Sequence, residues 1–105
     1  LIVFCSDSVA AEGIKFDFSQ GTATATDFRA HSTLFDSALL LSTQSTALAT
    51  AFNVATMTGS GMFESYFTIT VNAGGTFGPR FAQNSHVTGT ATAFRGSYMT
   101  MKDVL

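Results

Sequence analysis

The sequence predicts an all-β protein, an antiparallel β-sandwich or jelly roll of about seven or eight strands. Apolar and polar residues alternate along most of the chain, and turn residues separate the alternating segments. Hydrophobic residues make up 46% of the chain and charged residues only 11%, while sixteen threonines and eleven serines supply most of the polar groups. At 105 residues, without a linker or charge run, residues 1–105 are expected to form a single domain.

The N-terminal third contains three predicted strands. The apolar run Leu1–Cys5 predicts a strand in which the single cysteine is a small buried hydrophobe. Ile14–Ser19 alternates strictly, and Thr22–Phe35 begins with alternating Thr and Ala, which suits a solvent-facing strand. Because the chain opens inside a predicted strand and without Met, we expect it to be part of a longer polypeptide that has a further N-terminal segment.

The middle of the chain is less regular. Ser37–Leu41 and Ala47–Val54 are predicted strands, although the leucines in this region also fit a helix. Ser42–Ser45 lies between them and is predicted to be a turn, because it is a cluster of small polar residues. Gly59–Gly61 is predicted to be the turn that leads into the next strand.

The clearest strand is Phe63–Val71, whose odd-numbered residues are mostly apolar and whose even-numbered residues are polar. Asn72–Gly75 follows and predicts a hairpin turn, since glycine adopts positive φ without steric cost. Pro79 lacks an N–H group, so the next strand is expected at a sheet edge or to carry a bulge. Ala91–Met101 is the last predicted strand.

The composition excludes several functional classes. The five Lys and Arg residues are scattered, so they form no basic stripe of the kind that nucleic-acid binding requires. No apolar run approaches the roughly 18 residues of a membrane-spanning helix. A single cysteine excludes an internal disulfide and any zinc site built from several cysteines. Neither nucleic acid nor a membrane is therefore an expected partner.

No motif in the sequence predicts a chemical activity. Gly59–Gly61 lacks the Lys-Ser/Thr of a phosphate loop, and His31 and His86 have no carboxylates at ligand spacing. Calcium needs six to eight converging oxygens, and the aspartates are too evenly spread for that. We predict no catalytic residue, no metal and no cofactor. Four aspartates are instead expected to face solvent or stand in turns: Asp7, Asp17, Asp27 and Asp36.

Two segments near the C-terminus resemble a known family. Val71–Asn84 contains an Asn-Ala-Gly turn and ends in Phe-Ala-Gln-Asn, and Thr88–Met99 contains a Thr/Ala-rich stretch followed by Gly-Ser-Tyr. Together they resemble the C-terminal part of a β-domain that recurs in virion proteins of tailed bacteriophages. The Ile14–Phe18 and Phe28–Leu41 segments are similar to the same domain, though less specifically.

The resemblance implies a jelly-roll-like virion protein that decorates or cements the capsid from outside, as a homotrimer and without a catalytic residue. Its partners would be further copies of itself and the major capsid protein. It would be made in the host cytoplasm and reside on the outer capsid surface. The alternative is a tail-fibre or receptor-binding module for a carbohydrate or host surface, which exposed Trp and Tyr in the loops would favour. A small hydrolase is the third possibility, and the missing motifs argue against it.

Interface candidates follow from the strand pattern and from the segments that carry the resemblance. Tyr66 is the one aromatic residue on the polar face of its strand. Attachment to the capsid is expected at a turn-rich end near Gly74, Gly75 and Ser85–Gly89, or in the preceding N-terminal segment. The predicted interface residues are Tyr66, Gly74, Gly75, Pro79, Arg80, Asn84, His86 and Tyr98.

Overall fold

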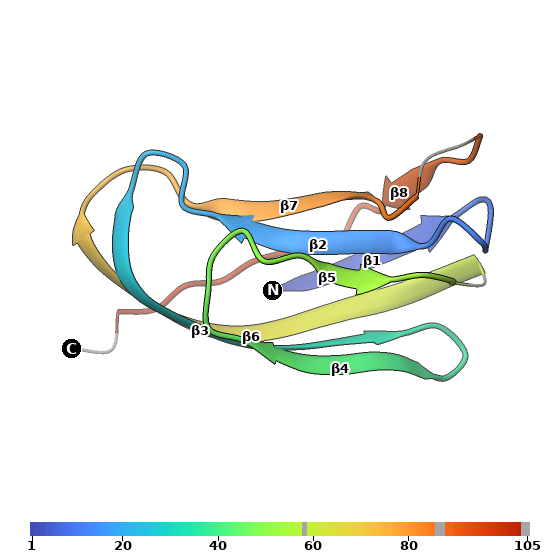
Figure 1. Ribbon diagram of the computed structural model, residues 1–105, viewed down its shortest axis with the longest axis horizontal. Helices are drawn as coiled ribbons and strands as arrows, with labels where there is room; N and C mark the ends of the chain where they lie inside the picture. The colour runs from blue at the N-terminus through green and yellow to red at the C-terminus, as the bar shows by residue number, and fades with distance from the viewer. Residues whose placement is uncertain (58, 86–87, 104–105) are drawn as a thin grey trace.

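The computed structural model describes residues 1–57, 59–85 and 88–103, apart from the side chain of Leu40. Over these residues the chain is all-β, with eight strands (Figure 1). This confirms the predicted fold class and strand number. The strands are β1 (Ile2–Asp7), β2 (Ile14–Ser19), β3 (Thr24–Phe35), β4 (Leu39–Ser45), β5 (Phe52–Val54), β6 (Gly59–Ala73), β7 (Gly78–Gln83) and β8 (Ala91–Ala93). No helix in the described residues could cross a membrane.

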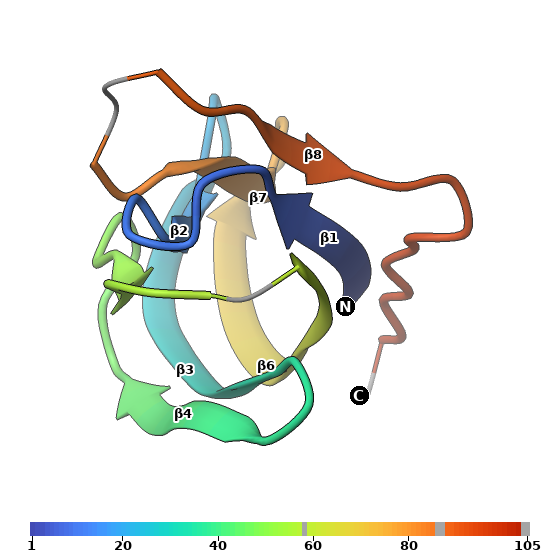
Figure 2. The ribbon, with the colours of Figure 1, turned by 90° about the vertical axis from the view of Figure 1, so that its right-hand side faces the viewer.

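The strands form two antiparallel sheets around a common interior, seen along the long axis in Figure 2. The five-stranded sheet has the order β4-β3-β6-β1-β8, and the three-stranded sheet has the order β5-β2-β7. Pairing joins β1 with β8, β2 with β7 and β3 with β6. The second half of the chain therefore runs back along the first half in nested order and alternates between the sheets, as in a jelly roll.

The long strands β3 and β6 form the centre of the larger sheet, and the alternation predicted along β6 is confirmed. Phe63 and Ser65 are buried on its inner side, whereas Tyr66 is exposed on its outer side. Gly59–Gly61 is not a turn but the start of β6, paired with the end of β1. A side chain at Gly61 would collide with the carbonyl oxygen of Phe35, so this glycine permits close strand packing.

The core consists of two clusters of buried side chains. In the larger one the rings of Phe16 and Phe63 are stacked with their centroids 3.9 Å apart. The smaller cluster is formed by Phe18, Phe28 and Ala30, with Phe67 and Phe77 packed against it. The larger cluster contains Val3, Cys5, Ile14, Phe16, Leu34, Phe52, Val54, Met57 and Phe63.

Two predictions for the middle of the chain are wrong. Ser42–Ser45 is not a turn but part of β4, because it pairs with Ala30–Thr33 of β3. The real turn precedes β4, where the carboxylate of Asp36 accepts the backbone N–H of Ala38 at 3.0 Å. Of the predicted strand Ala47–Val54, only the last three residues are a strand, since Ala49 has a φ of 59° and interrupts extended pairing.

The predicted last strand, Ala91–Met101, is also shorter than expected. β8 ends at Ala93, and the chain then turns at Gly96, whose φ is 98°. Tyr98 returns to the sheet through an isolated bridge to Ile2.

The predicted hairpin at Asn72–Gly75 is wrong as well. β6 already has β3 and β1 as neighbours, so β7 crosses to the other sheet and pairs with β2. Gly75 is required for a different reason, because a Cβ there would lie 2.5 Å from the backbone of Thr22 and Ala23. The expectation for Pro79 is confirmed, since β7 is an edge strand.

Candidate interaction surface

A row of apolar side chains crosses the outer face of the five-stranded sheet. The register pairs Leu39 with Phe35, Phe35 with Met62, and Met62 with Phe4, so one side chain comes from each of β4, β3, β6 and β1. Directly opposed residues have Cβ atoms about 5 Å apart, so the four side chains form one strip. Leu39 is 57% exposed, and Phe35 and Phe4 are also exposed. We call these four residues the apolar row.

The segment after β8 extends this surface beyond β1. The backbone N–H of Phe94 donates to the carbonyl oxygen of Phe4 at 2.7 Å, and Ser97 Oγ accepts the N–H of Phe4 at 3.0 Å. Ile2 and Tyr98 exchange two backbone hydrogen bonds of 2.8 Å. These bonds hold the exposed rings of Phe94 and Tyr98 at the β1 edge of the sheet.

The predicted interface residues Tyr66 and Tyr98 lie beside the same surface. Tyr66 is 70% exposed on β6 and stands opposite His31 of β3. Tyr98 is bridged to Ile2, which pairs with Glu64, and Glu64 is the outward residue next to Tyr66 along β6. The fold therefore places these two tyrosines, which are far apart in sequence, on the same face of the sheet with β1 between them.

The charged outward residues of this sheet are Glu64, two residues from Met62 along β6, and the Asp27–Arg29 pair of β3, whereas the other outward polar groups are neutral. His31 Nε2 and Ser42 Oγ lie 3.0 Å apart, and threonines occupy many of the other outward positions. Asp27 and Arg29 form an exposed pair, with 3.7 Å between carboxylate oxygen and guanidinium nitrogen, near the far end of β3. Because neutral groups lose less hydration energy than charges on burial, this face can be covered by another protein at small cost.

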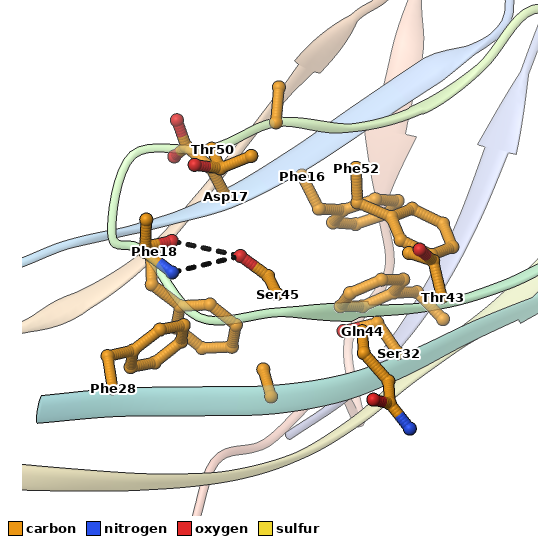
Figure 3. A pocket seen from close by; sticks show the side chains of 14 residues that line it. Phe16, Asp17, Phe18, Phe28, Ser32, Thr43, Gln44, Ser45, Thr50 and Phe52 are labelled. Atoms are coloured by element: carbon orange, nitrogen blue, oxygen red, sulfur yellow. Dashed lines mark hydrogen bonds between the residues drawn. The ribbon is translucent and has the colours of Figure 1, made fainter.

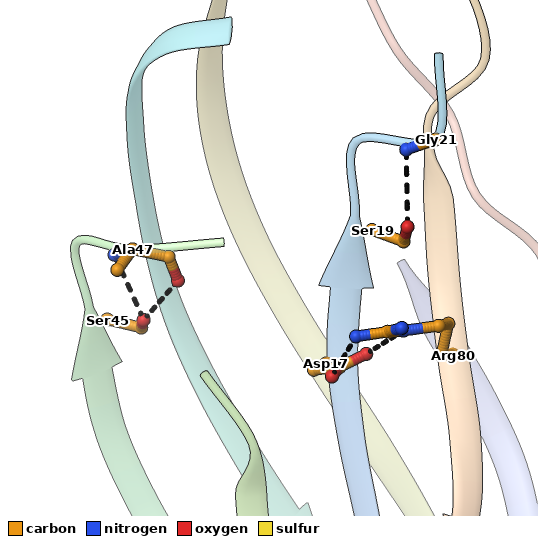
Figure 4. A network of polar contacts seen from close by, with 6 residues as sticks. All are labelled: Asp17, Ser19, Gly21, Ser45, Ala47 and Arg80. Atoms are coloured by element: carbon orange, nitrogen blue, oxygen red, sulfur yellow. Dashed lines mark hydrogen bonds and ion pairs between the residues drawn. The ribbon is translucent and has the colours of Figure 1, made fainter. Parts of the chain in front are cut away.

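The outer face of the three-stranded sheet has a different character. Arg80 of β7 donates two hydrogen bonds to the carboxylate of Asp17 of β2, at 2.7 and 2.6 Å (Figure 4). These bonds and the charge of Asp17 raise the pKa of Arg80 above its ordinary value. Arg80 was predicted as an interface residue, but its guanidinium is hydrogen-bonded to Asp17 of the same chain. Ser19 Oγ also has a partner within the chain, because it accepts the N–H of Gly21 at 3.2 Å.

The expected turn-rich end does not exist as a single site. Gly74 and Gly75 lie before β7, whereas the described part of Ser85–Gly89 lies after it, at the opposite end of the molecule (Figure 1). The strand β7 lies between the two turns in the sequence and carries the chain from one end of the molecule to the other. His86 lies outside the described residues.

A buried carboxylate, not predicted from the sequence, organises the second of these ends. Glu12 is 4% exposed, and its oxygens accept the backbone N–H groups of Thr88 at 2.8 Å and Gly89 at 2.9 Å, and Gln83 Nε2 at 2.6 Å. The backbone N–H of Asn84 donates to the carbonyl oxygen of Gly13 at 3.1 Å. Glu12 and Asn84 therefore fasten the chain after β7 to the turn before β2.

Two buried groups on β1 complete the inventory of reactive side chains. Asp7 is 4% exposed at the end of β1, so it does not face solvent. One of its carboxylate oxygens accepts the N–H of Val9 in the following turn at 3.2 Å, and the other has no hydrogen-bond partner among the described residues. Cys5 is buried as predicted, and burial raises the pKa of its thiol to about 11. The described residues contain no group of three or more His, Cys, Asp or Glu side chains that could hold a metal ion.

No family model, curated protein or solved structure matches this chain. The outer face of the five-stranded sheet presents aromatic rings, aliphatic groups and hydroxyls on a paired, well-supported sheet. Such groups make close-packed contacts with another protein surface. The arrangement suits binding.

Proposed function

We propose that this chain is a non-catalytic structural protein of a tailed-phage particle, which decorates and cements the capsid shell as a homotrimer. The observation that carries the proposal is the apolar row on the outer face of the five-stranded sheet. The resemblance of Val71–Asn84 and Thr88–Met99 to a virion β-domain supplies the biological setting.

The apolar row supports self-association because contiguous exposed apolar surface marks interaction sites and, left uncovered, favours aggregation. Leu39, Phe35 and Phe4 stand on hydrogen-bonded strands, so a partner would meet them without a large loss of backbone entropy. A neighbouring copy in a closed ring would cover this face in every subunit. With few charges on the face, the contact should depend little on salt.

A trimer leaves the two ends of the sandwich free to contact the shell. One end carries the Gly74–Gly75 turn, and the other is fastened by Glu12. Three weak contacts made together gain roughly 10²- to 10⁴-fold in avidity over a single contact. A protein that binds only the assembled shell stabilises it by mass action.

The test uses phage particles prepared without this protein, to which the purified chain is added back. We expect the chain to bind the head shell and to raise the temperature at which the shell releases DNA. A Leu39→Lys variant should bind more weakly, whereas a Lys15→Gln variant on the other sheet should bind like the wild type. Failure to bind the head, or binding at the tail tip alone, would overturn the proposal, and the latter result would favour the receptor-binding module.

A further inference from the structure

A cavity of about 100 Å³ lies where the two core clusters meet, beside β4 and the segment that leads to β5 (Figure 3). Its floor is made of buried side chains, and its rim is made of residues of β4 and of the segment 46–51, most of them exposed, together with the half-buried Asp17 of β2. The phenylalanines that line it come from β2, β3, β5 and β6: Phe16, Phe18, Phe28, Phe52 and Phe63.

The cavity follows from the residues on the inner side of β3. Phe28 and Leu34 fill the two ends of this strand face, but Ala30 and Ser32 between them are small. Ser32 Oγ donates to Ser65 Oγ at 2.9 Å, so each of these buried hydroxyls has a hydrogen-bond partner. The floor therefore offers few free polar groups that could bind a water molecule, and the space between the rings suits an apolar occupant.

The entrance lies between β4 and the segment that leads to β5. β5 has only three residues, so it leaves Thr43 at the edge of the cavity exposed. The rim is held in place by Ser45 Oγ, which donates to the carbonyl oxygen of Ala47 at 3.0 Å (Figures 3 and 4). The backbone N–H of Ala49 also donates to the carbonyl oxygen of Phe18 at 2.9 Å. A ligand can enter here without separating paired strands.

We propose that this cavity binds a free small aromatic molecule with a single six-membered ring. An engineered apolar cavity of about 150 Å³ in another protein binds benzene, and the present cavity is smaller but open at its rim. Aromatic rings attract a further ring in offset or edge-to-face geometry. Thr43 and Thr50 at the rim add hydroxyls that a phenol could reach. This proposal does not depend on the proposed function in the virion.

The probe is benzene, added to the purified chain during thermal unfolding and during titration followed by NMR. At a concentration equal to its dissociation constant, benzene should raise the Tm by about 2 °C. The largest chemical-shift changes should fall on Phe28, Ala30 and Phe52. Cyclohexanol serves as a non-aromatic comparison and should give a smaller shift in Tm.

Two variants test the location. Ala30→Leu fills the floor and should abolish the benzene-induced shift in Tm, whereas the matched Ala82→Leu, on an exposed position of β7, should keep it. Because Ala30→Leu can also strain the core, Ala47→Phe at the exposed rim provides a second block that leaves the floor unchanged. No shift in the wild type, or an equal shift in the wild type and both blocking variants, would overturn the proposal.

Discussion

The outer face of the five-stranded sheet exposes Leu39, Phe35 and Phe4 in one strip, whereas the outer face of the three-stranded sheet carries the half-buried Lys15 and the Asp17–Arg80 pair. Both faces arise from the same strand alternation, which sends every second residue away from the core. The difference shows that alternation selects the outward positions, while the residue types placed there decide whether a face suits water or another protein.

The largest difference in stability is expected between substitutions on the inner and outer sides of β6. Phe63→Ala removes a ring that is 1% exposed and stacked on Phe16, and it should lower the free energy of unfolding by about 3–5 kcal/mol. Tyr66→Ala on the outer side should change the stability of the monomer by less than about 0.5 kcal/mol. Urea unfolding at low protein concentration measures both, and similar losses would contradict the assignment of faces.

A smaller effect is expected on the inner side of β1, where the buried thiol of Cys5 should make the free energy of unfolding depend on pH. Burial raises the pKa of the Cys5 thiol to about 11, above the value of about 8.5 for a free thiol. The folded state then keeps a proton that the unfolded state loses, so stability is full below pH 8.5 and falls as the pH rises toward 11.

This fall should amount to about 3 kcal/mol, measured as the difference in unfolding free energy between the wild type and Cys5→Ala, which lacks the titrating group. In the same pH range a thiol reagent should react with Cys5 only when the protein unfolds. Rapid labelling of the native protein at pH 8 would show that the inner side of β1 is open.

The smallest effect is expected on the charged face. The Asp17–Arg80 pair is exposed on the Arg80 side, and exposed pairs contribute less than about 1 kcal/mol. Arg80→Gln should therefore lower stability slightly, and less so in 0.5 M salt than in dilute buffer. A loss of trimer in this variant would mean that the charged face, and not the apolar row, joins the subunits.

The sequence predicts the features that depend on a single strand. Alternation along β2 and β6, the burial of Cys5, the edge position of Pro79 and the exposure of Tyr66 are all local properties. The hairpin after β6 could not be judged locally, because it fails only when β1 and β3 occupy both sides of that strand.

The features missed from the sequence depend on pairing between distant segments. Glu12 binds backbone groups 76 and 77 residues away, and no local pattern marks it. The apolar row is assembled by the register of four strands from Phe4, Phe35, Leu39 and Met62, each of which looks like an ordinary strand residue on its own.

The most direct test of the apolar row is the mass of the purified chain in solution, measured by sedimentation equilibrium at about 20 micromolar, well above the roughly 1 micromolar range of moderately tight contacts. The wild type and Lys15→Gln should both have three times the 11.1 kDa of one chain. Leu39→Lys should have the mass of the monomer while keeping its β-sheet circular dichroism. A monomeric wild type, or a Leu39→Lys variant that stays trimeric, would contradict the account.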